Sequence, residues 1–582
     1  MTKITVIFNG LPVEAELGQT ILEAARSHGI KIPTLCHMEN LVPSGSCRIC
    51  VVEVEGERNL VPSCAFPVRD GMAVYTHSER VRRARKSIVE LLLANHPDEC
   101  LYCLRNGDCE LQKLAMDFGI RERRFTGNKN RYHIDSSSVA IERDPNKCVL
   151  CGRCVRVCDE IQGVGAIDFV GRGLDSVVLP PFNADLADSD CVFCGQCVLA
   201  CPTGALREKS ALRTVWSAIL NNKKKVIAQI APAVRVSMAE ELGLEPGTDI
   251  TGKIVAGLRL LGFDKIFDTN FAADVTVMEE ANELVERIKN GGTLPLMSSC
   301  SPAWIKFVER NYPEMLSHLS SCKSPQQMFG AIAKTYYAEQ QGWQPEDVFV
   351  VSIMPCTAKK FEATRPEMGR DGYQDVDAVL TTRELLRMLS TASVEVMRLA
   401  DGEFDHPLGE SSGAAVIFGT TGGVAEAALR TAVYLITGKD SEKVDFNVVR
   451  GFKGIKEAEV NIGDLTLKCA VVNGLSNARI VLDGLRDGSL SYDFIEVMSC
   501  PGGCVGGGGQ PAKDRSNIQA RAQSLYVIDA VKSVRTAHHN PEVKKLYKNF
   551  LGKPLGELSH KLLHTKYVPR YPKELNVAST KD

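Results

Sequence analysis

Residues 147–158 read Lys-Cys-Val-Leu-Cys-Gly-Arg-Cys-Val-Arg-Val-Cys, and residues 191–202 repeat the spacing as Cys-Val-Phe-Cys-Gly-Gln-Cys-Val-Leu-Ala-Cys-Pro. Both runs have the form C-x2-C-x2-C-x3-C, a spacing typical of 4Fe–4S cluster ligands. Where two such runs occur together, the fourth cysteine of each run binds the cluster of the other run. The spacing therefore predicts one cluster on Cys148, Cys151, Cys154 and Cys201 and a second on Cys158, Cys191, Cys194 and Cys197.

The pair of runs resembles a bacterial two-cluster ferredoxin, and the resemblance implies a domain over residues 126–209. Asp159 departs from this pattern, because Pro often follows the first run. The long segment between the runs is a second departure.

A further cysteine set lies near the N-terminus. Residues 4–16 alternate around Asn9-Gly10, which predicts a β-hairpin, and a helix is expected from about Thr20 to His28. The set that follows has the spacing C-x10-C-x2-C-x13-C and comprises Cys36, Cys47, Cys50 and Cys64. It resembles the N-terminal domain of the large electron-input subunit of respiratory complex I. The resemblance implies a β-grasp domain with one 2Fe–2S cluster over residues 1–80, and a zinc site is the alternative.

Between these domains stands a mixed set, His96-x3-Cys100-x2-Cys103-x5-Cys109. Taken alone, three cysteines and one histidine fit zinc as well as a cluster. Its position after the first set resembles the histidine-ligated 4Fe–4S domain shared by complex I and FeFe hydrogenases. The resemblance implies such a domain over residues 81–125.

Composition limits the remaining possibilities. A chain of 582 residues is expected to form several domains, and a net charge of −2 gives no electrostatic case for nucleic acid. We find no apolar run long enough for a membrane span and no signal-peptide core at the N-terminus, so we expect a cytoplasmic protein. In that compartment 21 cysteines indicate cluster or metal ligands rather than disulfides.

From residue 210 to 582 the pattern changes to an α/β domain with a helical C-terminal tail over 512–582. Apolar runs predict strands at 226–230, 294–297, 348–353 and 416–419, and amphipathic runs predict helices within 207–226 and at 273–289. Parallel sheets collect ligands at the loops that leave the carboxyl ends of their strands. Three cysteine motifs occupy such positions, at 298–304, 354–362 and 496–511.

These three motifs read Ser-Ser-Cys-Ser-Pro-Ala-Trp, Met-Pro-Cys-Thr-Ala-Lys-Lys-Phe-Glu and Glu-Val-Met-Ser-Cys-Pro-Gly-Gly-Cys-Val-Gly-Gly-Gly-Gly-Gln-Pro. They resemble the L1, L2 and L3 signatures of FeFe hydrogenases, and the match covers essentially the whole chain. The resemblance implies the reaction 2H⁺ + 2e⁻ ⇌ H₂ at an H-cluster, a 4Fe–4S cubane joined to a di-iron unit with CO, cyanide and azadithiolate ligands. It implies cubane ligation by Cys356, Cys500 and the bridging Cys504.

The same resemblance implies a set of pocket residues around the di-iron unit. Lys359 is expected to hydrogen-bond a cyanide, and Met354 and Met498 to supply soft walls. Gln326 and the segment Ala231-Pro232-Ala233 match further neighbours, although the family often has Ser at the position of Ala233. We expect the glycine run 506–509 to let the backbone approach the cofactor.

A proton path is also implied. Glu280 and Glu283 share a helix face at i, i+3, with Arg287 one turn further on. From the sequence alone this is more often a solvated face. By resemblance, Glu280, Glu283, Ser320 and Cys300 form the relay. Cys322 and Cys469 match no ligand set and are expected to be small buried residues.

L1 departs from the family pattern, because Cys300-Ser301 replaces a cysteine pair. Register makes Cys300 the relay residue and Ser301 the cubane ligand, whereas thiolate chemistry favours Cys300 as the ligand. The sequence leaves both assignments open.

Two rival functions remain. A complex I-like or formate-dehydrogenase electron-transfer subunit would explain the N-terminal clusters but not L1–L3. A non-catalytic H₂ sensor would use the same fold, but sensors typically lose the relay residues that this chain keeps. The expected partners of the hydrogenase are H₂, protons, and either ferredoxin or flavin- and NAD(P)-binding subunits of a multimeric bifurcating enzyme, because we find no nucleotide-binding motif here.

Overall fold

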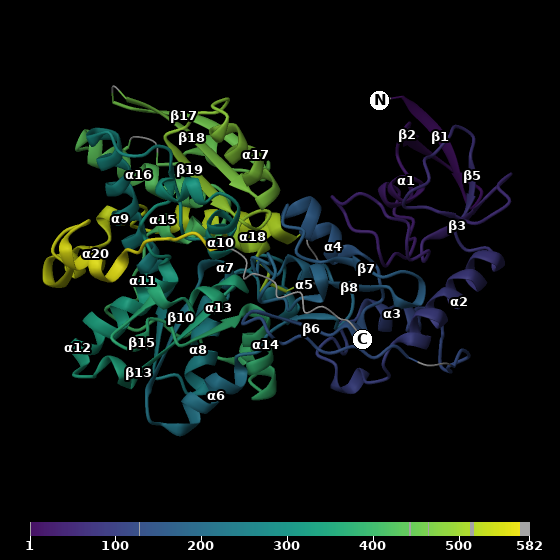
Figure 1. The fold of residues 1–582 in the computed structure, drawn as a ribbon, viewed down its shortest axis with the longest axis horizontal. Coiled ribbons are helices and arrows are strands. Elements are labelled where there is room, and N and C mark those ends of the chain that lie inside the picture. Colours follow the sequence, from purple (N-terminus) through teal and green to yellow (C-terminus); the bar gives the residue numbers. More distant parts are fainter. Residues whose placement is uncertain (1, 127–128, 442–443, 464, 512–516, 571–582) are drawn as a thin grey trace, which may run out of the picture.

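The computed structural model describes residues 2–126, 129–441, 444–463, 465–511 and 517–570. The N-terminal sheet lies at one end of the molecule and the large α/β domain at the other, with the two-cluster segment between them (Figure 1). No helix in the described part of the chain is long and apolar enough to cross a membrane.

The N-terminal sheet has the strand order β2-β1-β5-β3-β4. β1 (Lys3–Phe8) and β2 (Leu11–Glu16) form the expected hairpin, with positive φ at both Asn9 and Gly10 as a two-residue type I′ turn requires. α1 (Ile21–Ser27) begins at Thr20, whose hydroxyl and Glu23 form a capping box. β3 (Val51–Val54), β4 (Val61–Pro62) and β5 (Ala73–Tyr75) complete the sheet, with β5 parallel to β1. This is the expected β-grasp arrangement.

The next two segments hold their cysteines on short elements. α2 (Glu79–Asn95) ends at His96, and the 3-10 turn Cys100–Tyr102 and α3 (Glu110–Asp117) follow. In the two-cluster segment, α4 (Arg153–Arg156) and α5 (Gln196–Ala200) each begin after a left-handed glycine. β6 (Ile141–Arg143) pairs with β9 (Leu206–Glu208), and the long inter-run segment folds into a hairpin of β7 (Asp168–Val170) and β8 (Val177–Leu179).

The large domain contains two four-stranded sheets. The first is entirely parallel, in the order β11 (Lys265–Asp268), β10 (Lys225–Ile230), β13 (Val348–Met354) and β16 (Ala378–Thr381). The second has the order β12 (Leu296–Met297), β19 (Phe494–Met498), β18 (Leu465–Asn473) and β17 (Ile455–Ile462), with β17 antiparallel.

Helix α9 (Thr269–Asn290) contributes to the cores on both sides of the large domain and packs against α11 (Pro325–Ile332) and α16 (Gly423–Thr437). The predicted helix 273–289 is therefore correct and four residues longer at its N-terminus, where Asp268 caps it. The predicted helix within 207–226 is α6 (Leu212–Asn221).

The strand predicted at 416–419 is wrong. Those residues end α15 (Gly413–Val416) and form a 3-10 turn over Ile417–Gly419. The run is buried on all sides, and a short apolar run without alternation does not distinguish a buried helix from a buried strand.

The C-terminal part contains the expected helices, α18 (Ile518–Val531), α19 (Pro541–Leu546) and α20 (Glu557–Leu563). They do more than cover the surface, because Leu525, Leu546 and Leu563 are fully buried. Residues 512–516 and 571–582 of the predicted tail lie outside the described residues.

Candidate active site and iron–sulfur sites

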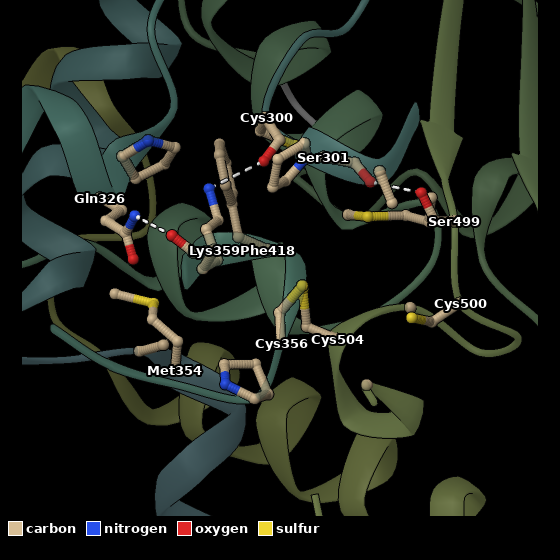
Figure 2. Close-up of a pocket in the computed structure, with 18 of the residues that line it drawn as sticks. Cys300, Ser301, Gln326, Met354, Cys356, Lys359, Phe418, Ser499, Cys500 and Cys504 are labelled. Carbon is tan, nitrogen blue, oxygen red and sulfur yellow. Dashed lines mark hydrogen bonds between the residues drawn. The ribbon is translucent and has the colours of Figure 1, made fainter. Parts of the chain in front are cut away.

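Strands from both sheets of the large domain end at one cavity. β10 and β13 lead directly into Ala231-Pro232 and Pro355-Cys356, while β12 and β19 lead into the loops that carry Cys300 and Cys500. The cavity measures about 820 Å³, including space that is open to solvent. Segments 231–233, 298–304, 354–362 and 496–511, far apart in the sequence, therefore meet at one place (Figure 2).

Five cysteines line this cavity: Cys300, Cys356, Cys500 and Cys504 from the three motifs, and Cys194 from the two-cluster segment. Burial raises the pKa of the Cys500 and Cys504 thiols to about 12, and the nearby Cys356 thiol adds to the effect at both. Closely spaced thiols in such a place fit a metal cluster, because a bound metal lowers the cost of thiolate formation. Gln326 Oε1 is also buried without a hydrogen-bond partner in the described structure. The donor set thus fits the cofactor that L1–L3 imply.

Cys300 and Ser301, which are consecutive in the chain, have different neighbours in the cavity. The Cys300 thiol has its pKa raised by burial and then by the charge of Glu280, and Lys359 Nζ donates to the Cys300 carbonyl oxygen at 3.1 Å. Ser301 Oγ instead lies 2.7 Å from Ser499 Oγ, on the side where Cys500 is found (Figure 2). Each of the two residues therefore has a distinct environment.

The remaining predicted pocket residues also line the cavity, with the exception of Ala233. Lys359 Nζ contacts Glu362 Oε2 at 2.9 Å, and Gln326 Nε2 donates to the same oxygen at 3.1 Å. Met354 and Met498 are each 3% exposed. Ala233 is fully buried behind this lining, where its carbonyl oxygen accepts a hydrogen bond from Gln510 Nε2 at 3.2 Å.

The glycine run packs closely on other backbone segments. A Cβ on Gly506, Gly507 or Gly508 would collide with the carbonyl oxygens of Pro501, Pro355 and Cys194 respectively. These glycines are therefore required where loop L3 packs closely on backbone carbonyl groups, and Gly507 also lines the cavity.

Glu280 and Glu283, the two predicted relay carboxyl groups of α9, are buried. Glu280 is 2% exposed, and its pKa is raised to about 8, first by burial and then by the charge of Glu283. Ser320 Oγ donates to Glu283 Oε2 at 3.0 Å, and Arg287 Nη2 donates to Glu283 Oε1 at 2.7 Å. The alternative of a solvated helix face is therefore wrong. The row Cys300, Glu280, Ser320 and Glu283 leads from the cavity towards Arg287.

The N-terminal ligand sets are brought together as predicted. One small cavity is lined by Cys148, Cys151, Cys154 and Cys201, and another by Cys158, Cys191, Cys194 and Cys197. A third is lined by His96, Cys100, Cys103 and Cys109. His96 Nδ1 contacts the Pro97 carbonyl oxygen at 3.0 Å, while its Nε2 is buried without a partner in the described structure and is free to bind a metal. In the first set, Cys36 interacts with Cys47 and Cys50 with Cys64.

The two-cluster segment forms direct hydrogen bonds with the active-site loops. Cys194 lines both its own small cavity and the central one. Thr357 Oγ1 donates to the Phe193 carbonyl oxygen at 2.7 Å, and Gln196 Nε2 donates to the Gly506 carbonyl oxygen at 2.9 Å.

Sequence reasoning missed Ser499 and Phe418, which also line the cavity. Ser499 could have been noticed as the neighbour of Cys500. Phe418 was not recognised, because the apolar run that contains it predicted a strand. Cys322 and Cys469 are buried as expected, and Cys322 Sγ lies 3.9 Å from Glu283 Oε2.

Known protein families match the whole of this architecture. Residues 224–508 match the C-terminal domain of the iron only hydrogenase large subunit, and residues 515–570 match the iron hydrogenase small subunit. Residues 1–79 match a 2Fe-2S iron-sulfur cluster binding domain, residues 85–124 the NADH-ubiquinone oxidoreductase-G iron-sulfur binding region, and residues 119–205 a 4Fe-4S dicluster domain.

Individual relatives agree with these matches. The chain is 50% identical to the NADP-reducing hydrogenase subunit HndD of Solidesulfovibrio fructosivorans, over 98% of this chain and 100% of that protein. It is 44% identical to iron hydrogenase 1 of Clostridium pasteurianum, over 97% of this chain and 99% of that protein. A solved apo FeFe hydrogenase from Chlamydomonas reinhardtii superposes with a TM-score of 0.57 and 41% identity, covering 62% of this chain and 99% of that one. The chain therefore belongs to the FeFe hydrogenases, oxidoreductases that act on H₂, and carries N-terminal iron–sulfur domains that relay electrons to its H-cluster domain.

Proposed function

We propose that Cys356, Cys500, Cys504 and Ser301 would hold the H-cluster in the central cavity. When bound, this group supplies the iron site at which protons and electrons combine reversibly into H₂. The observation that carries the proposal is the meeting of L1, L2 and L3 at one cavity with their cysteines on its wall. A Cys504→Ala variant that kept H₂ turnover would contradict it.

We propose that Cys300 is the proton-relay residue and Ser301 the fourth ligand. The support is the separation of their neighbours, because Cys300 interacts with Glu280 and Lys359 whereas Ser301 pairs with Ser499. A serine alkoxide is a hard donor for an iron cluster, and the hydroxyl of Ser499 at 2.7 Å would stabilise its charge by donating a hydrogen bond.

Spectroscopy of protein that carries the cubane but not the di-iron unit separates the two assignments. We expect Ser301→Cys to change the electron paramagnetic resonance spectrum of the reduced cubane, because a thiolate replaces an oxygen. Cys300→Asp should keep that spectrum. Ser299→Ala is the matched control, because Ser299 Oγ donates to the Cys322 carbonyl oxygen instead. Loss of the cubane in Cys300→Asp with an unchanged spectrum in Ser301→Cys would make Cys300 the ligand.

We propose that protons travel between Cys300 and Glu283 through Glu280 and Ser320. A carboxyl with a pKa near 8 still holds a proton at neutral pH and can give it up to a neighbouring base. The Ser320 hydroxyl donates to Glu283 and can pass a proton between the two carboxyl groups. Around the di-iron unit, Lys359 and Gln326 would supply the donors, and Met354, Met498, Ala231 and Pro232 the walls.

We propose that the N-terminal sets hold one 2Fe–2S and three 4Fe–4S clusters, with domain boundaries at residues 80, 125 and 209. Electrons would leave the ferredoxin segment beside Cys194. The electron partners would be flavin- and NAD(P)-binding subunits of a cytoplasmic complex, supported by full-length similarity to a protein named as an NADP-reducing hydrogenase subunit.

The partner proposal has a direct test. With H₂ as donor, the isolated chain should reduce a one-electron dye but not NADP⁺, because we find no GxGxxG or P-loop motif with its strand–helix context in the sequence. NADP⁺ reduction by the isolated chain would contradict the proposal.

A further inference from the structure

A second group of polar side chains lies beside Glu283, at the outer end of the proposed proton relay. It joins α9 to residues 320–322 and to the end of α20. Ser321 Oγ donates to Glu283 Oε2 at 3.2 Å and also lies 2.8 Å from His564 Nδ1. The other ring nitrogen, His564 Nε2, lies 3.1 Å from Glu279 Oε2. A carboxylate, an imidazole, a hydroxyl and a second carboxylate are therefore linked in one chain.

Glu279 provides a fixed negative charge at the inner end of this chain. It is fully buried, which acts to raise its pKa, but hydrogen bonds from His564, Ser559 and Tyr547 outweigh burial and leave the pKa lowered. The hydroxyl groups of Tyr547 and Ser559 and the backbone N–H of Leu555 donate to its oxygens at 2.5, 2.5 and 2.8 Å. An ionised carboxylate accepts only, so His564 must carry a proton on Nε2.

Two proton arrangements then satisfy every group in the chain. In the first, Glu283 is ionised, Ser321 donates to it, and a doubly protonated His564 donates to Ser321 and Glu279. In the second, a protonated Glu283 donates to Ser321, Ser321 donates to His564 Nδ1, and the imidazole is neutral. The arrangements interconvert when the Ser321 hydroxyl gains one proton and loses another, so no donor is left without an acceptor in either state.

Glu283 needs such a neighbour because its other charged partner cannot supply protons. Arg287 Nη2 holds Glu283 Oε1 at 2.7 Å, but a guanidinium does not release a proton in a protein. Ser321 is partly exposed, so water reaches this link of the chain.

We infer that His564 is the base that exchanges protons between Glu283 and solvent, with Ser321 as the link and Glu279 as the anion that holds the imidazole. The inference rests on the proposed relay through Glu280 and Glu283. In the H₂-forming direction a proton leaves His564 Nδ1 for the Ser321 oxygen while the Ser321 proton moves to Glu283 Oε2. The proton on His564 Nε2 stays in its hydrogen bond to Glu279, and His564 Nδ1 is reprotonated from water.

The test uses the loaded enzyme and the variant His564→Gln, which keeps a polar side chain but cannot cycle a proton. We expect H₂ evolution to fall at least about tenfold, which is less than the roughly 10²- to 10⁴-fold effect of an acid–base group at the reacting atoms, because His564 lies further along the relay. In His564→Ala, added imidazole should restore a large part of the rate. His133→Gln is the matched control, because His133 is an exposed histidine of the two-cluster segment and should leave the rate unchanged. His560 cannot serve as the control, because its ring centroid lies 4.3 Å from that of His564.

Ser321→Ala is a second variant that tests the same chain of hydrogen bonds if the His564 variants do not fold. It removes only the hydroxyl and keeps the backbone N–H of residue 321 on Glu283. We expect the same slowing with an unchanged infrared signature of the H-cluster ligands.

Rates near wild type in both His564→Gln and Ser321→Ala would overturn the inference. Slow His564→Ala enzyme that imidazole does not restore would also overturn it, because the histidine would then be structural. Glu283→Gln distinguishes a failure of the proposed relay from a failure of the proposed role of His564. If that variant is as fast as wild type, the proposed relay itself is wrong. If it is slow while His564→Gln is fast, only the role of His564 is wrong.

Discussion

The variant Glu280→Gln tests how the fold prepares a proton donor next to the active site. Burial, and then the charge of Glu283, raise the Glu280 pKa to about 8. At pH 7 about ten Glu280 side chains then carry a proton for each that is ionised, whereas a glutamate with the ordinary pKa of 4.5 is almost fully ionised. Gln copies the shape of the protonated acid but cannot pass the proton on. We therefore expect H₂ evolution to fall by roughly 10² to 10⁴.

The same pKa predicts a change in stability with a defined sign. The folded protein keeps a proton on Glu280 that the unfolded chain loses above the ordinary value of 4.5, so stability is lost as pH rises from there to about 8. Glu280→Gln removes this loss. Above pH 8 the variant should be the more stable protein, by an upper limit of roughly 5 kcal/mol, because one pKa unit corresponds to about 1.4 kcal/mol.

Two measurements check these expectations. Dye-driven H₂ evolution between pH 6 and 10 should fall in wild type as pH rises through about 8, and Glu280→Asp, which keeps a carboxyl group, should retain more activity than Glu280→Gln. Thermal unfolding over the same range should give a wild-type Tm that falls relative to that of Glu280→Gln. The reasoning fails if Glu280→Gln turns over within threefold of wild type, or if the two Tm values run parallel with pH.

Three further expectations concern the clusters. Fully loaded protein should contain about 20 iron atoms, as the cluster types of its motifs require. A stoichiometric zinc content would contradict this count, and the set with His96 would be the first to be reassigned as a zinc site. Cys504→Ala should abolish H₂ chemistry while the visible spectra of the N-terminal clusters stay intact; a parallel loss of those spectra would show that the variant disturbs the whole chain. His96→Cys should lower the reduction potential of its cluster, because a thiolate adds negative charge where a neutral imidazole stood; redox titration of that cluster's signal would show no shift if His96 is not a ligand.

The cluster domains could be predicted from the sequence because their ligands lie close together along the chain. Spacings of two or three residues already place thiols around one centre, and even the exchange of Cys158 and Cys201 between runs follows from the repeat. The β-hairpin at Asn9-Gly10 and the long helix α9 are equally local, since a turn type and an apolar periodicity define them.

The active site could be predicted only in part, because its loops are far apart in the sequence and only the tertiary structure brings them together. Resemblance supplied the residues of L1–L3, but the different surroundings of Cys300 and Ser301 depend on Glu280 and Ser499, which belong to other elements. The burial of Glu280 and Glu283 contradicts what their helical spacing favours, since spacing does not reveal what packs on a helix. Ser321, His564 and Glu279 share no local motif, and no pattern joins residues 243 positions apart.

The close packing between the ferredoxin segment and loop L3 has a kinetic consequence. A Cβ on Gly195 would collide with Thr357, and one on Gly508 with the carbonyl oxygen of Cys194, so the two backbones touch without an intervening layer of side chains or solvent. A donor fixed in this way does not have to diffuse, collide and dissociate in each cycle. Electron delivery to the active site is then a first-order event whose rate does not depend on carrier concentration. Any dependence on carrier concentration is confined to the outermost clusters, where this chain meets other proteins.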